Sequence, residues 1–304
     1  MSCRSHLLVL GLLFLALPAF SQPTSSAPPQ KVALRFAAKL GDKPFACGQT
    51  FTNIGVTHAT VTPTDLRFFV THVKLLDAAG NETPVALDQD GTFQYRDLAL
   101  VDLEDGSGGC RNGNPATHTA IMGTVPAGTY TGVRFTVGVP FDLNHLDPVS
   151  APAPLNFTAM SWVWQAGFKF IRAEVAVKTP APPSADSPRS ASKPMGRESA
   201  GFPVHLGSTG CVSSSPTTAP ATECAHPNRV VVTLTSFDPA ADTVLFDFDH
   251  LLAASDVTRN TAKTSPGCMS FPNDPDCAPI FGSLGLAFND APAGEQTVFR
   301  TAPR

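Results

Sequence analysis

The chain has 304 residues, of which 21 are Lys or Arg and 25 are Asp or Glu, and its formal net charge is −4 at pH 7. This slightly acidic balance excludes the basic surface by which proteins bind nucleic acids or anionic membranes. The chain also contains 29 Pro and 23 Gly, a composition typical of short strands joined by turns. Its length suits one large all-β domain or two small ones.

The N-terminus has the pattern of a secretory signal. Arg4 precedes the apolar run Leu7–Leu17, and the small residues Ala19 and Ser21 follow it. The run is too short to span a bilayer, and no later stretch has the required length. We therefore expect a cleaved signal peptide over residues 1–21, a flexible segment over 22–30, a single domain over 31–304 and export to the periplasm, without a membrane span.

Cleavage of the signal would remove Cys3 and leave an even number of cysteines. The remaining six are Cys47, Cys110, Cys211, Cys224, Cys268 and Cys277. In an oxidising compartment an even number predicts disulfides, and the sequence alone does not choose among the pairings. Short loops favour Cys211–Cys224 and Cys268–Cys277, which leaves Cys47–Cys110. The alternative, a thiolate metal site, needs tighter spacing such as Cys-x-x-Cys.

Apolar residues recur with period two in several segments that are bounded by turn residues. In chain order these segments cover residues 31–37, 66–75, 130–139, 168–177, 229–237 and 243–248. They predict an all-β fold, an antiparallel β-sandwich or barrel-like single domain with long loops and disulfides. The Pro- and Ser-rich stretch over 179–199 is predicted to be a mobile surface insertion.

The two tryptophans of the chain, Trp162 and Trp164, are two residues apart. In extended backbone their indoles lie on the same face. Indoles are oxidisable and imidazoles are the commonest metal ligands, so a Trp pair between histidines indicates a redox-metal site. A Trp pair packed in a sheet core is the structural alternative.

The histidines differ in their surroundings. His145 and His205 are flanked by turn formers and lie close in sequence to the Trp pair and to Cys211, which makes them candidate ligands. His72 shares a predicted strand face with Leu66, Phe68 and Val70 and is expected to be buried. His58, His118 and His226 lie in polar contexts and are expected at the surface.

Patterns for other chemistry are weak. The segment Gly207–Gly210 resembles neither a nucleophile elbow nor a phosphate-binding loop. The acidic run Asp102–Gly106 lacks the ligand spacing of a calcium loop, so a solvated turn is the better interpretation. Because no acid–base or nucleophile constellation is present, we predict that the protein is not an enzyme.

Ordered blocks between Val32 and Phe299 carry a family resemblance. The most specific are Trp162–Gly167 and His205–Cys211. The others are Phe45–Gly48, Asp65–Val70, Gly138–His145, Ala153–Asn156, Met160–Phe170, Pro227–Arg229 and Phe281–Leu286. Together they resemble the bacterial metallo-mystery pair system four-Cys motif proteins, an MbnP-like family related to the methanobactin-associated periplasmic copper-binding protein. Two tyrosines that are usual in these blocks are replaced by Phe69 and Phe168.

The resemblance implies a partner, a di-haem enzyme similar to cytochrome c peroxidases, which oxidises a tryptophan to kynurenine. The modified protein then binds copper as Cu(I) or Cu(II). On this chain the implied sites of oxidation are Trp162 and Trp164, and the implied ligands are His145 and His205. A kynurenine group or the sulfur of Met160 would serve as a weak third ligand.

Asn144 and Asp147 are expected to accept hydrogen bonds from the imidazole of His145. The alternative function is a β-sandwich binding module for an organic ligand or a glycan, with the Trp pair as an aromatic platform.

Overall fold

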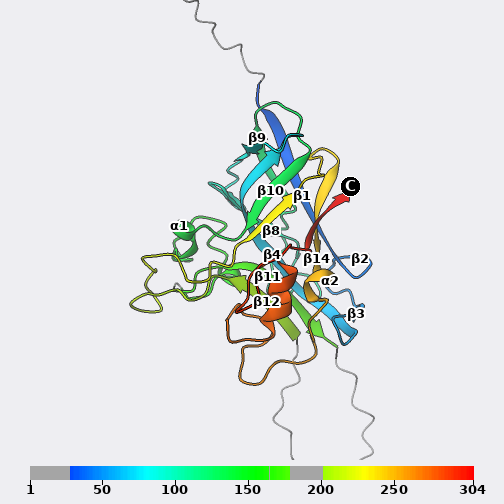
Figure 1. Ribbon diagram of the computed structural model, residues 1–304, viewed down its shortest axis with the longest axis vertical. Helices are drawn as coiled ribbons and strands as arrows, with labels where there is room; N and C mark the ends of the chain where they lie inside the picture. The colour runs from blue at the N-terminus through cyan, green and yellow to red at the C-terminus, as the bar shows by residue number, and fades with distance from the viewer. Residues whose placement is uncertain (1–27, 164, 179–200) are drawn as a thin grey trace, which may run out of the picture.

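The computed structural model describes residues 28–163, 165–178 and 201–304, and strands dominate it (Figure 1). The predicted signal peptide, the insertion over 179–199 and Trp164 lie outside these residues. Within the described part of the chain, none of the helices is long and apolar enough to cross a membrane.

The smaller sheet has six strands in the order β15–β14–β1–β9–β6, with β2 also paired to β1. Its strands are β1 (Gln30–Leu40), β2 (Lys43–Pro44), β6 (Ala86–Leu87), β9 (Ala120–Val125), β14 (Asp242–Asp247) and β15 (Phe299–Pro303). Side chains of β1 alternate between buried and more exposed positions, as expected for a strand with one face on a core. The pairing of β1 with β14 is parallel, whereas the other pairs of this sheet are antiparallel.

The larger sheet has nine strands, and the long strand β4 lies at its centre. The strands are β3 (Phe51–Ile54), β4 (Ala59–Leu76), β5 (Glu82–Pro84), β7 (Gln94–Tyr95), β8 (Leu98–Asp102), β10 (Gly132–Val137), β11 (Lys169–Val177), β12 (Gly201–Gly207) and β13 (Val230–Leu234). The main path runs β12–β11–β4–β10–β13, and β3, β5 and β8 also pair with β4. Residues 65–71 of β4 are all buried, so both faces of the strand are covered at its centre.

Short helices lie in the connections. They are α1 (Phe141–Asn144), the 3-10 turn η1 (Thr158–Met160), α2 (Phe248–Leu252) and α3 (Cys277–Ser283). Asp247 caps α2, because its Oδ1 accepts the backbone N–H of His250. In Figure 1, α1 and α2 lie on opposite sides of the strands.

A cluster of phenylalanines joins the two sheets. Phe68 of β4 stacks on Phe246 of β14 at a centroid distance of 5.5 Å. It also meets Phe36 of β1 and Phe299 of β15 edge to face, at 5.7 and 5.5 Å. Such edge-to-face contacts add to the free energy gained by burying apolar area. The two sheets therefore form a sandwich, which confirms the predicted fold class.

Three disulfides are present in the fold. They join Cys47 to Cys110, Cys211 to Cys224 and Cys268 to Cys277. This is the pairing that the short loops of the sequence favour.

Two histidines lie in environments other than those expected. His72 has φ 53° and sits where the register between β4 and β10 shifts, so its side chain points outward and is 53% exposed. The bulge breaks the alternation that predicted burial. His118, expected at the surface, stacks on Phe93 at 4.7 Å and hydrogen-bonds the Leu100 carbonyl.

Candidate metal centre

A row of polar residues crosses the larger sheet. Strand register places His205 of β12 opposite Arg172 of β11, Arg172 opposite Arg67 of β4, and Arg67 opposite Asp102 of β8. Residues that face each other in antiparallel strands project to the same side of the sheet. Because the neighbouring residue Phe68 projects into the sandwich core, this polar row lies on the outer face, where loops cover it.

His205 is held by a carboxylate from the adjacent strand. Its Nε2 lies 2.6 Å from Oε1 of Glu174, and Arg172 Nε donates to the same oxygen at 2.7 Å. Burial lowers the pKa of His205, although Glu174 opposes this effect. Burial alone would raise the pKa of Glu174, but the hydrogen bonds from His205 and Arg172 outweigh it and lower the pKa to about 2. Burial thus favours the neutral form of His205, and because Nε2 faces the Glu174 carboxylate, Nδ1 is the nitrogen left for a metal.

The polar row continues as a buried ionic network. Asp65 accepts two hydrogen bonds from Arg67 and lies 3.2 Å from Nε of Arg172. Arg67 also lies 3.6 Å from Glu104, and burial raises the pKa of Asp102 to about 7. The expectation of a solvated turn at residues 102–106 is thus wrong for Asp102 and Glu104, which are fully buried. The guanidinium of Arg67 supplies the positive charge that makes their burial tolerable.

Trp162 stands at the base of a tight loop between η1 and β11. Its backbone N–H donates to the Gly167 carbonyl, and Ser161 forms an antiparallel β-bridge with Phe168. Its ring lies 6.5 Å from that of His205. Gly207 permits this approach, since a Cβ at that position would lie 2.4 Å from the Trp162 ring. The structure therefore brings one predicted oxidation site and one predicted ligand together.

His145 follows α1 and is almost fully buried. Its Nε2 accepts a hydrogen bond from Nδ2 of Asn144 at 3.2 Å and lies 3.6 Å from Sγ of Cys224. The prediction that Asn144 accepts from this ring is wrong, because the atom of Asn144 that faces Nε2 is the donor Nδ2, while its Oδ1 accepts the N–H of Phe168. Asp147 binds Val149 N–H and Ser150 instead.

The two predicted ligands border the same loop. Asn144 contacts this loop by accepting the N–H of Phe168, and its Nδ2 also approaches Ser208, three residues after His205. Gly167 has φ 79°, and a Cβ there would lie 2.4 Å from the Asn144 carbonyl. Residues 161–163 and 165–168 of this loop thus pack against the segment of His145 on one side and against the ring of His205 on the other. Met160, considered as a weak ligand, is fully buried in the apolar core.

An apolar cavity of about 440 Å³ opens beside Trp162. Its lining includes Val163, Cys211, Met269 and Phe271, and both Val163 and Phe271 are about half exposed. Exposed apolar side chains around a cavity are typical of a binding surface. The cavity borders Trp162 and Cys211.

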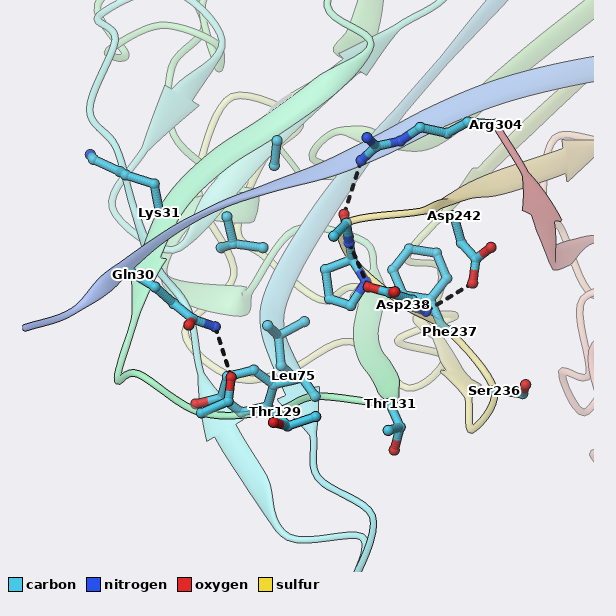
Figure 2. A pocket seen from close by; sticks show the side chains of 16 residues that line it. Gln30, Lys31, Leu75, Thr129, Thr131, Ser236, Phe237, Asp238, Asp242 and Arg304 are labelled. Atoms are coloured by element: carbon cyan, nitrogen blue, oxygen red, sulfur yellow. Dashed lines mark hydrogen bonds between the residues drawn. The ribbon is translucent and has the colours of Figure 1, made fainter. Parts of the chain in front are cut away.

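A second cavity, of about 800 Å³, lies among the start of β1, the β9–β10 turn and the C-terminus (Figure 2). Its polar groups bind one another: Arg304 donates to the Pro239 carbonyl, and Asp242 accepts the N–H of Asp238. None of the described site residues predicted from the sequence lines it.

Glu174, Arg172, Asp65 and Arg67 were missed as site residues. Their signal is visible in the sequence, because Asp65 and Arg67 are two residues apart in a strand, as are Arg172 and Glu174. Charged residues at this spacing share a face. The register between β4 and β11, which the sequence does not show, brings the two pairs together.

Comparisons with known proteins identify the family of the chain. The family described as MbnP matches residues 29–270. The solved structure of MbnP from Methylosinus trichosporium is 35% identical in sequence, with a TM-score of 0.78, and the match covers 91% of this chain and 99% of that one. A search of curated proteins finds no match. The chain belongs to the MbnP family.

Proposed function

We propose that this chain is a periplasmic copper-binding protein in which His145 and His205 are the imidazole ligands. The observation that carries the proposal is the geometry of His205, a buried imidazole whose Nε2 lies 2.6 Å from Glu174 and whose ring lies 6.5 Å from that of Trp162. Neutral imidazole suits copper, and a carboxylate behind the ring fixes its tautomer. The donors present therefore fit copper, which bound here would provide an electron-transferring or transportable ion.

We further propose that a di-haem partner similar to cytochrome c peroxidases oxidises Trp162 or Trp164 to kynurenine before copper binds. Trp162 supports this proposal, since it lines an open cavity and touches the ring of His205. An oxidant can reach its indole, and a modified ring would lie beside the metal ligand. Copper acquisition or handling is the role that such a protein would serve.

Copper affinity of the disulfide-bonded protein tests the ligand assignment. We expect His145→Ala and His205→Ala each to abolish or strongly weaken Cu(I) binding in a competition titration against a chromogenic chelator, with ascorbate as reductant. The control is His250→Ala, because His250 is exposed and its hydrogen bond to Asp247 is made by the backbone N–H, which the substitution keeps. If both site variants bind Cu(I) like the wild type, the assignment is wrong.

Peptide mass mapping of protein from its native periplasm tests maturation. Conversion of Trp to kynurenine removes one carbon and adds one oxygen, so we expect this mass change on the peptide containing Trp162 and Trp164. Deletion of the partner should restore the unmodified mass. An unmodified peptide from cells that make the partner would refute maturation while leaving the histidine ligands in place.

The apolar cavity favours a second function, a binding module for an organic ligand with Trp162 as its platform. Binding of such a ligand should fall in Trp162→Ala and stay unchanged in His145→Ala. The copper proposal predicts the opposite dependence on His145, so the same two variants separate the functions.

A further inference from the structure

We propose that reduction of the Cys211–Cys224 disulfide creates an alternative metal site that shares His145 with the copper site, and in which both thiolates and the imidazole of His145 bind a thiophilic ion such as Zn²⁺ or Cu(I). One nitrogen of His145 and the two sulfurs all lie within 4.8 Å of one another. The proposal goes beyond the copper function above, because it requires neither His205 nor an oxidised tryptophan.

The spacing of the donor atoms suits a tetrahedral ion. Zinc–sulfur bonds of about 2.3 Å and zinc–nitrogen bonds of about 2.0 Å place sulfur and nitrogen about 3.5 Å apart. Nε2 of His145 lies 3.6 Å from Sγ of Cys224. Reduction would let the sulfurs separate to the roughly 3.8 Å of two thiolates on one ion. Binding would replace the hydrogen bond from Asn144 to the same Nε2, and Asn144 keeps its contact with Phe168.

The two cysteine residues differ in exposure. Cys211 lines the cavity beside Trp162, whereas Cys224 is buried against His145. A dithiol reductant would therefore attack the sulfur of Cys211, forming a mixed disulfide as Cys224 leaves as a thiolate. The second thiol of the reductant then displaces Cys211. The dithiol becomes a disulfide, two electrons reach the protein, and two protons go to solvent as the thiolates bind the ion.

The other two disulfides lack this arrangement. Among the described residues, one further group of three donors converges, and it consists of Cys47, Cys110 and Glu104. Glu104 is engaged there by the N–H groups of Gly106 and Asn114 and by Arg67. Both carboxylate oxygens are thus used within the protein. Imidazole is also the better partner for thiolates on a soft ion.

Cobalt(II) is the probe for the test, because thiolate ligands give it a charge-transfer absorption that imidazole and carboxylate ligands do not. The full protein is reduced anaerobically with a phosphine, freed of reductant and titrated with Co²⁺. We expect the absorption to saturate at one ion per chain, and to be absent from the oxidised protein. Absence of the band from the reduced protein would overturn the proposal.

Variants identify the ligands. Cys211→Ser/Cys224→Ser should lose the band, and His145→Gln should bind Co²⁺ at least roughly tenfold more weakly. Cys268→Ser/Cys277→Ser and His205→Gln are the matched controls and should keep it. Unchanged binding in His145→Gln, or a band in the Cys211/Cys224 variant, would contradict the assignment.

A measurement on the wild type covers the case in which a variant fails to fold. Zn²⁺ should slow alkylation of Cys211 and Cys224 in the reduced protein, as read by peptide mass, without slowing alkylation of Cys268 or Cys277. Equal protection of all these cysteines would overturn the site. Because the copper test uses disulfide-bonded protein, the failure of either proposal can be told from that of the other.

Discussion

Glu174 is the residue on which the candidate metal centre depends most. One of its oxygens accepts hydrogen bonds from His205 and from Arg172, at 2.6 and 2.7 Å. The Glu174 carboxylate, on β11, therefore orients His205 of the adjacent strand β12. Arg172, also on β11, neutralises its charge. Loss of this carboxylate would free the His205 ring to rotate and would leave Arg172 with Asp65 as its acidic partner.

The depressed pKa of Glu174 predicts a pH dependence of stability. Its pKa is about 2 in the folded chain against an ordinary 4.5. The unfolded state therefore binds more protons between these values, and the unfolding free energy falls as the pH drops from about 4.5 to 2. We expect Glu174→Gln to lose up to about 3 kcal/mol at pH 7 relative to the wild type, and this difference to vanish by pH 2.

Urea unfolding at a series of pH values measures this difference, with Glu82→Gln as the control. Glu82 pairs with Lys74 and Arg134 at the surface, where ion pairs contribute little. If the unfolding free energies of Glu174→Gln and the wild type depend on pH in the same way, the Glu174 carboxylate does not stabilise the fold.

Lys169 joins two elements of the site. It begins β11, and its Nζ donates to the carbonyls of Ala159 and Ser161 at 2.8 and 3.1 Å. Burial, reinforced by the charge of Arg172, lowers its pKa to about 8. The ammonium thus fastens η1 to the sheet immediately before Trp162.

Replacing the Lys169 side chain should weaken the attachment of η1 to the sheet. We expect Lys169→Met to lower the unfolding free energy by about 1–3 kcal/mol, because the two carbonyls lose a charged donor. Urea unfolding checks the value. Lys74→Met is the matched control and should cost less than about 1 kcal/mol, since its ion pair with Glu82 is partly exposed. Equal losses in the two variants would argue against a fastening role.

At the level of elements, period-two patterns predict much of the sheet but not its pairing. The segments over 31–37 and 168–177 correspond to β1 and β11; β1 alternates because one of its faces is buried, whereas residues 169–173 of β11 are buried on both faces. Strand β4 begins seven residues before the predicted start at Leu66; residues 59–64 also alternate, but Pro63 argues against a strand when the sequence is read alone. The parallel pairing of β1 with β14 and the bulge at His72 depend on tertiary packing, which local periodicity does not encode.

The same limit applies to the site. The candidate ligands His145 and His205 follow from the resemblance of short blocks, and the likeness in both sequence and structure supports the family. The network behind His205 depends on which strands are neighbours. Arg172 meets Asp65 because β11 pairs with β4. Contacts of this kind become predictable once register is known.

In the whole molecule, the hydrophobic core and the candidate metal centre lie on opposite faces of the larger sheet. The smaller sheet contributes Phe36, Phe246 and Phe299 to the shared interior, while the polar row lies on the other face of the larger sheet. Phe68 and Arg67 are neighbours in β4 and project to these opposite sides. A single strand therefore supports both the sandwich core and the network behind His205.

Because β4 supports both, we expect a substitution in the core to destabilise the candidate metal centre as well. Phe68 is fully buried and touches three rings of the smaller sheet, so Phe68→Ala should lower the unfolding free energy by about 3–5 kcal/mol. Circular dichroism and tryptophan fluorescence should shift together, because both sheets share this ring. The control Val231→Ala, at a half-exposed position of β13, should change little. A fluorescence midpoint that stays at the wild-type value would show that the tryptophan loop unfolds independently of the sandwich.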